Sequence, residues 1–191
     1  MTLSRQLVIQ QTKSWVKEVV IGLNLCPFAS AVFEKDRINY LVINDDGTAD
    51  NMAMHLHHLA DSFKELDNPD TYETSLLIFP EAYRQFDDYL DFLDIANRLL
   101  EDLNYAGIYQ LASFHPDYRF EGSAEDDASN FSNRSPYPML HLLKESSIEK
   151  AVASYHRMNK NIEQVPEDNI KKLRDIGYKK MQQMIENIIQ E

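Results

Sequence analysis

The strongest constraint on the fold is an alternation of two hydrophobic patterns in the middle of the chain. Residues 38–43, 74–79 and 108–114 are short runs rich in apolar, β-branched or aromatic side chains, which is typical of strands. Residues 52–66 and 86–103 instead repeat apolar side chains every three or four positions, as one face of a helix does. This order favours parallel strands joined by right-handed crossovers, so we predict an α/β fold with about three strands.

An α+β fold that contains a hairpin, such as a ferredoxin-like arrangement, is the alternative if one strand escapes recognition. Further helices are expected at both ends of the chain. Residues 3–23 carry a broad helical stripe, and residues 166–191 predict one long helix that begins at Pro166. We expect one domain over residues 1–191, with residues 147–191 as a helical extension packed on it.

The charge balance excludes broad classes of function. The chain has 19 Lys and Arg against 31 Asp and Glu, a net charge of −12, so we expect no general nucleic-acid binding. No run approaches the roughly 18 apolar residues of a membrane span, and the N-terminal segment lacks the apolar core of a signal peptide. The single cysteine, Cys26, cannot form an internal disulfide. These observations predict a cytoplasmic protein and say nothing of its oligomeric state.

Polar and ionisable side chains concentrate in residues 114–143, FHPDYRFEGSAEDDASNFSNRSPYPMLHLL. Ser135 and Pro136 fit a helix cap and a first helical residue, so we expect a helix through residue 143. If the three strands are parallel, this segment shares one sheet edge with residues 44–47 and 80–84, and ligands bind outside such an edge. We therefore place the functional site in this segment.

Three motifs resemble those of a bacterial family catalogued only as a domain of unknown function. They are GLNLCPFA, FHPDYRF and NRSPYPMLHLL, and they lie in the same order as in that family. The resemblance covers most of the chain and implies a compact bacterial cytosolic protein. It supplies no activity, cofactor or catalytic residue, so the chemistry has to be argued from the residues.

The first hypothesis for the site is anion binding. Arg119 and Arg134, assisted by Asn133 and His141, could grip a phosphate or carboxylate, because a guanidinium binds such groups through two parallel hydrogen bonds. The alternative is that both arginines pair with carboxylates of the same segment and pin a long loop.

The second hypothesis is acid–base catalysis by His115, whose ordinary pKa suits proton transfer at neutral pH. Asp117 would orient His115 or act as the base. Cys26 is a candidate nucleophile if it approaches His115 or His141, although a lone cysteine between apolar residues is more often a small buried hydrophobe.

A divalent metal is the third hypothesis, with His115 and Asp117 joined by His141 or Asp127 as ligands. No spacing here matches a known ligand motif. A further group, His55, His57 and His58, is predicted to be solvated or to flank the apolar stripe of its helix.

The leading functional prediction is a small enzyme that acts on a phosphate- or carboxylate-bearing small molecule by histidine acid–base chemistry. The alternative is a non-catalytic ligand-sensing or protein-interaction module.

Overall fold

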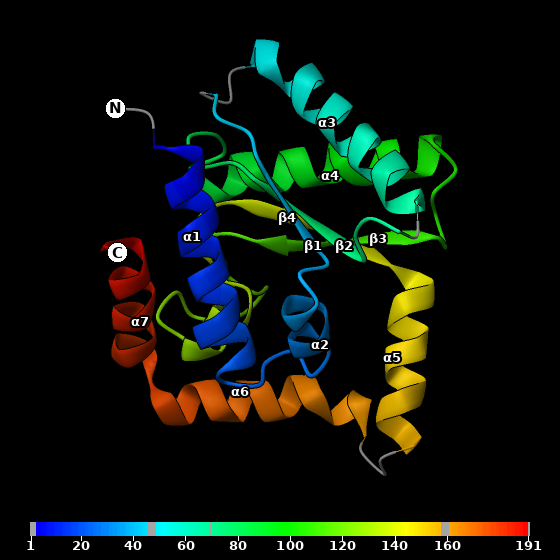
Figure 1. Ribbon diagram of the computed structural model, residues 1–191. Coiled ribbons are helices and arrows are strands. Elements are labelled where there is room, and N and C mark those ends of the chain that lie inside the picture. Colours follow the sequence, from blue (N-terminus) through cyan, green and yellow to red (C-terminus); the bar gives the residue numbers. More distant parts are fainter. Residues whose placement is uncertain (1–2, 46–48, 69, 158–160, 191) are drawn as a thin grey trace.

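One mixed sheet forms the centre of the protein (Figure 1). The computed structural model describes residues 3–45, 49–68, 70–157 and 161–190. The strand order is β1-β2-β4-β3. The strands are β1 (Ile38–Val42), β2 (Thr74–Ile78), β3 (Tyr109–Phe114) and β4 (Met139–Lys144). Strand β2 is parallel to β1, whereas β4 is antiparallel to both β2 and β3. Strands β1, β2 and β3 therefore run in the same direction, and the predicted α/β class is confirmed.

Strand β4 corrects the prediction of a helix at residues 135–143. Ser135 does not cap a helix, because its hydroxyl donates to the carbonyl of Tyr137 at 2.6 Å. Leu140 and Leu142 are fully buried on one face of the sheet, and Met139 is fully buried on the other. Pairing on both sides, with β2 and β3, satisfies the backbone of this short segment better than an isolated helical turn could.

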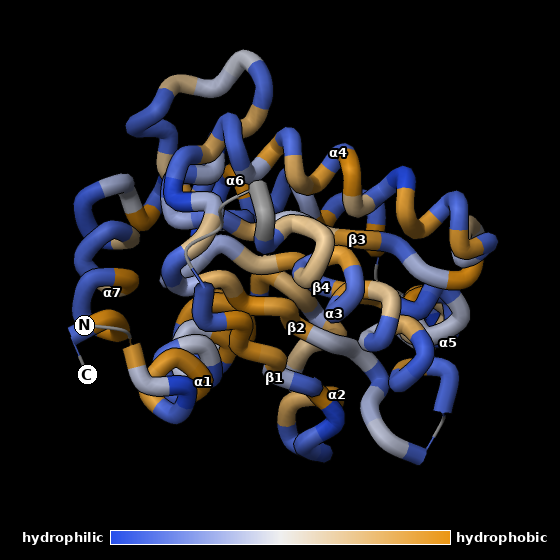
Figure 2. Tube along the Cα trace, turned by 90° about the horizontal axis from the view of Figure 1, so that it is seen from above, coloured by the Kyte–Doolittle hydropathy of each residue, from blue (hydrophilic) through white to orange (hydrophobic). Residues whose placement is uncertain are grey.

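Helices cover both faces of the sheet. Helices α3 (Ala49–Asp67) and α4 (Phe86–Asp102) pack on one face, where Leu59, Phe63 and Phe92 meet Leu77 and Leu140. The other face carries α1 (Arg5–Trp15), its π-helical continuation η1 (Val16–Ile21), α6 (Val165–Ile176) and α7 (Tyr178–Gln190). Figure 2 shows hydrophobic residues gathered along the central strands, while α4 and α7 alternate between hydrophilic and hydrophobic positions.

The remaining helices are α2 (Ala29–Glu34), α5 (Glu145–Arg157) and the 3-10 turns η2 (Ala128–Ser132) and η3 (Ile162–Gln164). The single helix predicted over residues 166–191 is wrong, since Gly177 adopts φ 87° and divides it into α6 and α7. Glycine tolerates this left-handed conformation, which other residues rarely adopt. Within the described ranges, no helix combines the length and apolarity needed to cross a bilayer.

Candidate functional site

The segments that follow β1, β2 and β3 converge at one edge of the sheet, as predicted for strands of common direction. Asp45 follows β1, Tyr83 follows β2, and His115 follows β3. His55 of α3 hydrogen-bonds the side chains of Asp45 and Tyr83, and His115 hydrogen-bonds the backbone carbonyl of Tyr83. We call Asp45, His55 and Tyr83 the edge triad.

His55 is the centre of the edge triad and is fully buried. Its Nε2 lies 2.7 Å from the carboxylate of Asp45, and its Nδ1 lies 2.6 Å from the hydroxyl of Tyr83. The rings of Phe79 and Phe92 surround the imidazole at centroid distances of 5.2 and 6.0 Å. Because a carboxylate only accepts hydrogen bonds, a neutral His55 carries its proton on Nε2, and Nδ1 accepts the proton of the Tyr83 hydroxyl.

Tyr83 is held in an unusual backbone conformation, with φ 54°. Such left-handed backbone is costly for a residue with a Cβ and persists where the surroundings fix it, often at functional sites. Here its ring stacks on Phe92 at 4.2 Å, and its carbonyl accepts a hydrogen bond from Nε2 of His115 at 2.9 Å. Burial, with a smaller contribution from the negative charge of Asp45, raises the pKa of the phenol. Tyr83 is therefore protonated at rest.

His115 donates a hydrogen bond to the backbone of Tyr83. It is fully buried, and its Nδ1 accepts the backbone N–H of Asp117 at 3.0 Å, so the proton lies on Nε2 and is donated to Tyr83. Burial lowers the pKa of His115 and keeps it neutral. The structure joins His115 and Asp117 through the backbone N–H of Asp117, whose side chain is exposed. Both ring nitrogens of His115 face the backbone.

Arg134 is buried and fixes the segment between β3 and β4. Its guanidinium donates to the carbonyls of Tyr118 and Glu125 at 3.0 and 2.9 Å and to the hydroxyl of Tyr178 at 3.3 Å. The rings of Phe131 and Tyr178 lie on it at 4.9 and 5.4 Å. These donors, predicted to bind an anion, are directed at two backbone carbonyls and a tyrosine hydroxyl. The second predicted anion ligand, Arg119, is exposed.

The other predicted site residues lie apart from one another. Asn133 donates to the carbonyl of Ser113 at 3.0 Å and ties the segment to β3. His141 lies within β4, and its Nε2 is 2.7 Å from the hydroxyl of Thr74. Cys26 lies between η1 and α2, where burial raises the pKa of its thiol. Within the described part of the chain, no hydrogen bond joins this thiol to a histidine.

The metal hypothesis finds no ligand set in the described residues, which contain no group of three or more His, Cys, Asp or Glu side chains placed to hold an ion. Asp127 instead forms a bidentate ion pair with Arg174 at 3.1 and 2.7 Å, which lowers the pKa of this carboxyl. Two open hollows, of about 420 and 360 Å³, lie on α6–α7 and on α1–α2, and residues 114–143 line neither of them.

The edge triad was not predicted from the sequence, because His55 was expected to be solvated or to flank the apolar stripe of its helix. A signal was present, since His55, Leu59, Phe63 and Leu66 follow one another at helical spacing and are all buried. A histidine inside such a stripe needs polar partners. Asp45 and Tyr83 lie in the two segments already expected at the same edge. By contrast, the prediction of a solvated His57 agrees with its side-chain exposure of 73%.

Acidification should destabilise the protein through His141. Burial lowers the pKa of His141 from an ordinary 6.5 to about 4, so the unfolded chain binds the proton more readily. The stabilisation is complete above pH 6.5 and is lost as the pH falls toward 4, an effect of about 3 kcal/mol. Urea unfolding between pH 7 and 4 measures it. His141→Asn should flatten this pH dependence relative to the parent, and an equally steep variant would contradict the assignment.

Comparison with known proteins identifies a family that matches most of the chain. A family model described as "Protein of unknown function (DUF1415)" matches residues 7–183, which include the edge triad and the whole segment between β3 and β4. No curated protein and no solved structure matches the chain.

Proposed function

The chain belongs to the DUF1415 family, whose function is unknown, and we propose that it is a small-molecule enzyme that transfers protons through Tyr83. As expected from the sequence, the proposed chemistry is acid–base catalysis that involves a histidine. That histidine is His55 and not His115. We place the enzyme in the bacterial cytoplasm, a reducing compartment that suits a chain with one unpaired cysteine.

The observation that carries the proposal is the alignment of carboxylate, imidazole and phenol in the edge triad. The proton of the Tyr83 hydroxyl points at Nδ1 of His55, while Asp45 holds the Nε2 proton. When Tyr83 gives its proton to Nδ1, the resulting imidazolium lies against the ionised Asp45, which stabilises the positive charge. The phenolate then takes a proton from one atom of the substrate and delivers it to another atom, which forms the product. The phenolate that remains recovers its own proton from Nδ1 of His55. The roles of base and orienting carboxylate follow the logic of serine–histidine–aspartate sites.

The substrate in this proposal is anionic, as the sequence analysis also expected. Arg84 follows Tyr83 directly, and its side chain is 69% exposed, paired only with Glu81 among the contacts of the described residues. An ion pair whose arginine is largely exposed contributes little to stability, so a substrate carboxylate or phosphate can replace Glu81 at small cost. Arg84 would then hold the anionic end of the substrate beside the phenol of Tyr83.

The test needs no prior substrate. A metabolite mixture in D₂O is incubated with the parent protein and followed by NMR for consumption or for exchange of a carbon-bound hydrogen. We expect at least one phosphate- or carboxylate-bearing compound to change with the parent and not with Tyr83→Phe. Tyr72→Phe, at a partly buried tyrosine outside the edge triad, is the matched control and should behave as the parent. Equal turnover by Tyr83→Phe, or no change with any compound, would overturn the proposal.

A further inference from the structure

A second feature lies far along the chain from the edge triad, where Gly177 turns the chain between α6 and α7 (Figure 1). A hollow of about 420 Å³ opens at this bend. We call it the elbow hollow; its lining is Asp168, Lys171, Lys172, Asp175, Ile176 and Lys180. We propose that the elbow hollow binds a phosphorylated small molecule that also carries hydroxyl groups.

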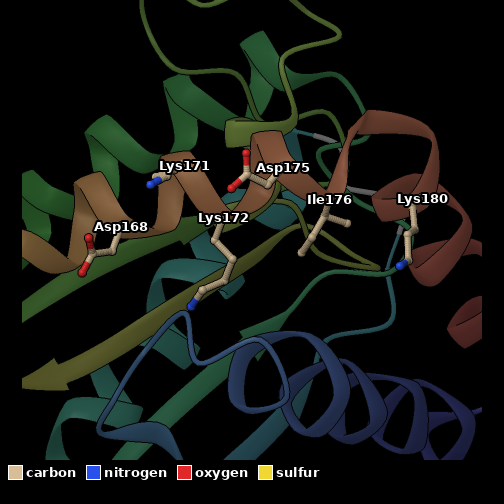
Figure 3. A pocket seen from close by; sticks show the side chains of 6 residues that line it. All are labelled: Asp168, Lys171, Lys172, Asp175, Ile176 and Lys180. Atoms are coloured by element: carbon tan, nitrogen blue, oxygen red, sulfur yellow. The ribbon is translucent and has the colours of Figure 1, made fainter.

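The lining of the elbow hollow is locally basic, with three lysines against two aspartates, whereas the chain as a whole is acidic. Three of its lining residues are lysines, in a chain whose net charge is −12. Lys172 and Lys180 extend from α6 and α7 to the same side of the bend, with Ile176 between them (Figure 3). A phosphate is attracted locally to such a group of ammonium ions, and lysine binds it as a point charge without a fixed geometry.

Within the described residues, the charged side chains around the elbow hollow form no close ion pair with one another. Asp168, Lys171 and Asp175 follow at spacings of three and four residues along α6, where ion pairs form readily. None of the ion pairs within the described ranges involves them or Lys180. Their charges therefore remain available to a ligand.

The two helices that carry the elbow hollow are fixed by contacts with the rest of the fold. Lys172 donates to the carbonyl of Leu23 at 2.6 Å, and Asn169 donates to the carbonyl of Leu25 at 2.7 Å, so α6 is bound to the GLNLCPFA motif. The Arg174–Asp127 ion pair and the bond from Arg134 to Tyr178 hold the bend against the segment between β3 and β4. A hollow whose walls are already ordered requires little rearrangement to bind a ligand.

The two carboxylates of the lining favour a ligand that carries hydroxyl groups as well as a phosphate. Asp168 and Asp175 repel a bare polyanion, but they accept hydrogen bonds from hydroxyl groups. The lysines and carboxylates together thus fit a molecule with a phosphate at one end and hydroxyls at the other. The volume of about 420 Å³ lies within the roughly 300–1,000 Å³ that is usual for small-molecule sites.

Calorimetric titration of the full chain with glucose 6-phosphate, inorganic phosphate and glucose tests this assignment. We expect saturable binding of glucose 6-phosphate, weakened at least roughly tenfold by the double variant Lys171→Gln/Lys180→Gln. The control Lys35→Gln/Lys150→Gln removes the same charge at exposed positions outside the hollow and should bind as the parent does. Asp168→Asn/Asp175→Asn should strengthen the binding of inorganic phosphate and abolish the preference for the sugar phosphate.

Absence of saturable binding of either phosphate compound, or an equal loss in the control variant, would overturn the proposal. So would unchanged binding by Lys171→Gln/Lys180→Gln. The result is separable from the edge triad, because Lys171→Gln/Lys180→Gln leaves Tyr83 and Arg84 in place and should keep any turnover that the parent shows.

Discussion

Replacing Arg134 by methionine should lower the free energy of unfolding by roughly 3–5 kcal/mol, because three part-buried hydrogen bonds from its charged, buried guanidinium are lost. Methionine keeps much of the side-chain volume but cannot donate to the carbonyls of Tyr118 and Glu125 or to the hydroxyl of Tyr178. The stacking of the guanidinium on Phe131 is also lost. Urea denaturation of parent and variant measures the difference.

Arg119→Met is the matched control for this change. Arg119 is exposed, and substitutions at such positions usually alter stability by less than about 0.5 kcal/mol. Arg134→Lys should recover only part of the loss, since an ammonium cannot reproduce the planar set of donors. A cost near that of Arg119→Met would show that Arg134 does not hold the segment between β3 and β4.

Replacing His55 by leucine should lower the free energy of unfolding by roughly 3 kcal/mol, because the carboxylate of Asp45 and the hydroxyl of Tyr83 lose their shared partner. Leucine fills a similar space among Phe79 and Phe92, so the effect reports the lost hydrogen bonds more than lost packing. The same variant should lack any turnover found for the parent. Thermal and urea unfolding give the first result, and the metabolite assay gives the second.

His57→Leu changes the same chemistry two residues along α3, at an exposed position, and separates a loss at the edge triad from a general effect on the helix. We expect it to unfold within about 0.5 kcal/mol of the parent and to retain turnover. If His55→Leu were as stable and as active as His57→Leu, the edge triad would be neither a structural nor a chemical unit.

Hydrophobic periodicity was enough to predict the three strands of common direction and the helices between them. It failed at β4 because Leu140, Leu142 and Leu143 form a short apolar run that fits a strand or a helix equally well. The preceding Ser135 and Pro136 suggested a helix start. This segment forms a strand because it fills the space between β2 and β3 and pairs with both, which only the tertiary structure reveals.

Strand direction predicted the sheet edge at which the edge triad lies, but the sequence analysis placed the site in residues 114–143, which contribute none of the three side chains of the triad. The common edge followed from strand direction, and Asp45, Tyr83 and His115 all lie on it. The sequence could not show that His115 would turn both nitrogens to the backbone, or that the donors of Arg134 would reach carbonyls. Those outcomes depend on how the segment between β3 and β4 folds back on itself.

The most direct test of the edge triad is the position of the proton on His55. Long-range ¹H–¹⁵N NMR correlation spectra of the uniformly labelled parent, with His55→Leu to assign the signals, distinguish the two ring nitrogens. We expect the proton of the resting imidazole of His55 on Nε2 and none on Nδ1, which accepts the hydroxyl of Tyr83. A proton on Nδ1 would contradict it, since His55 could then not receive the proton that Tyr83 has to release.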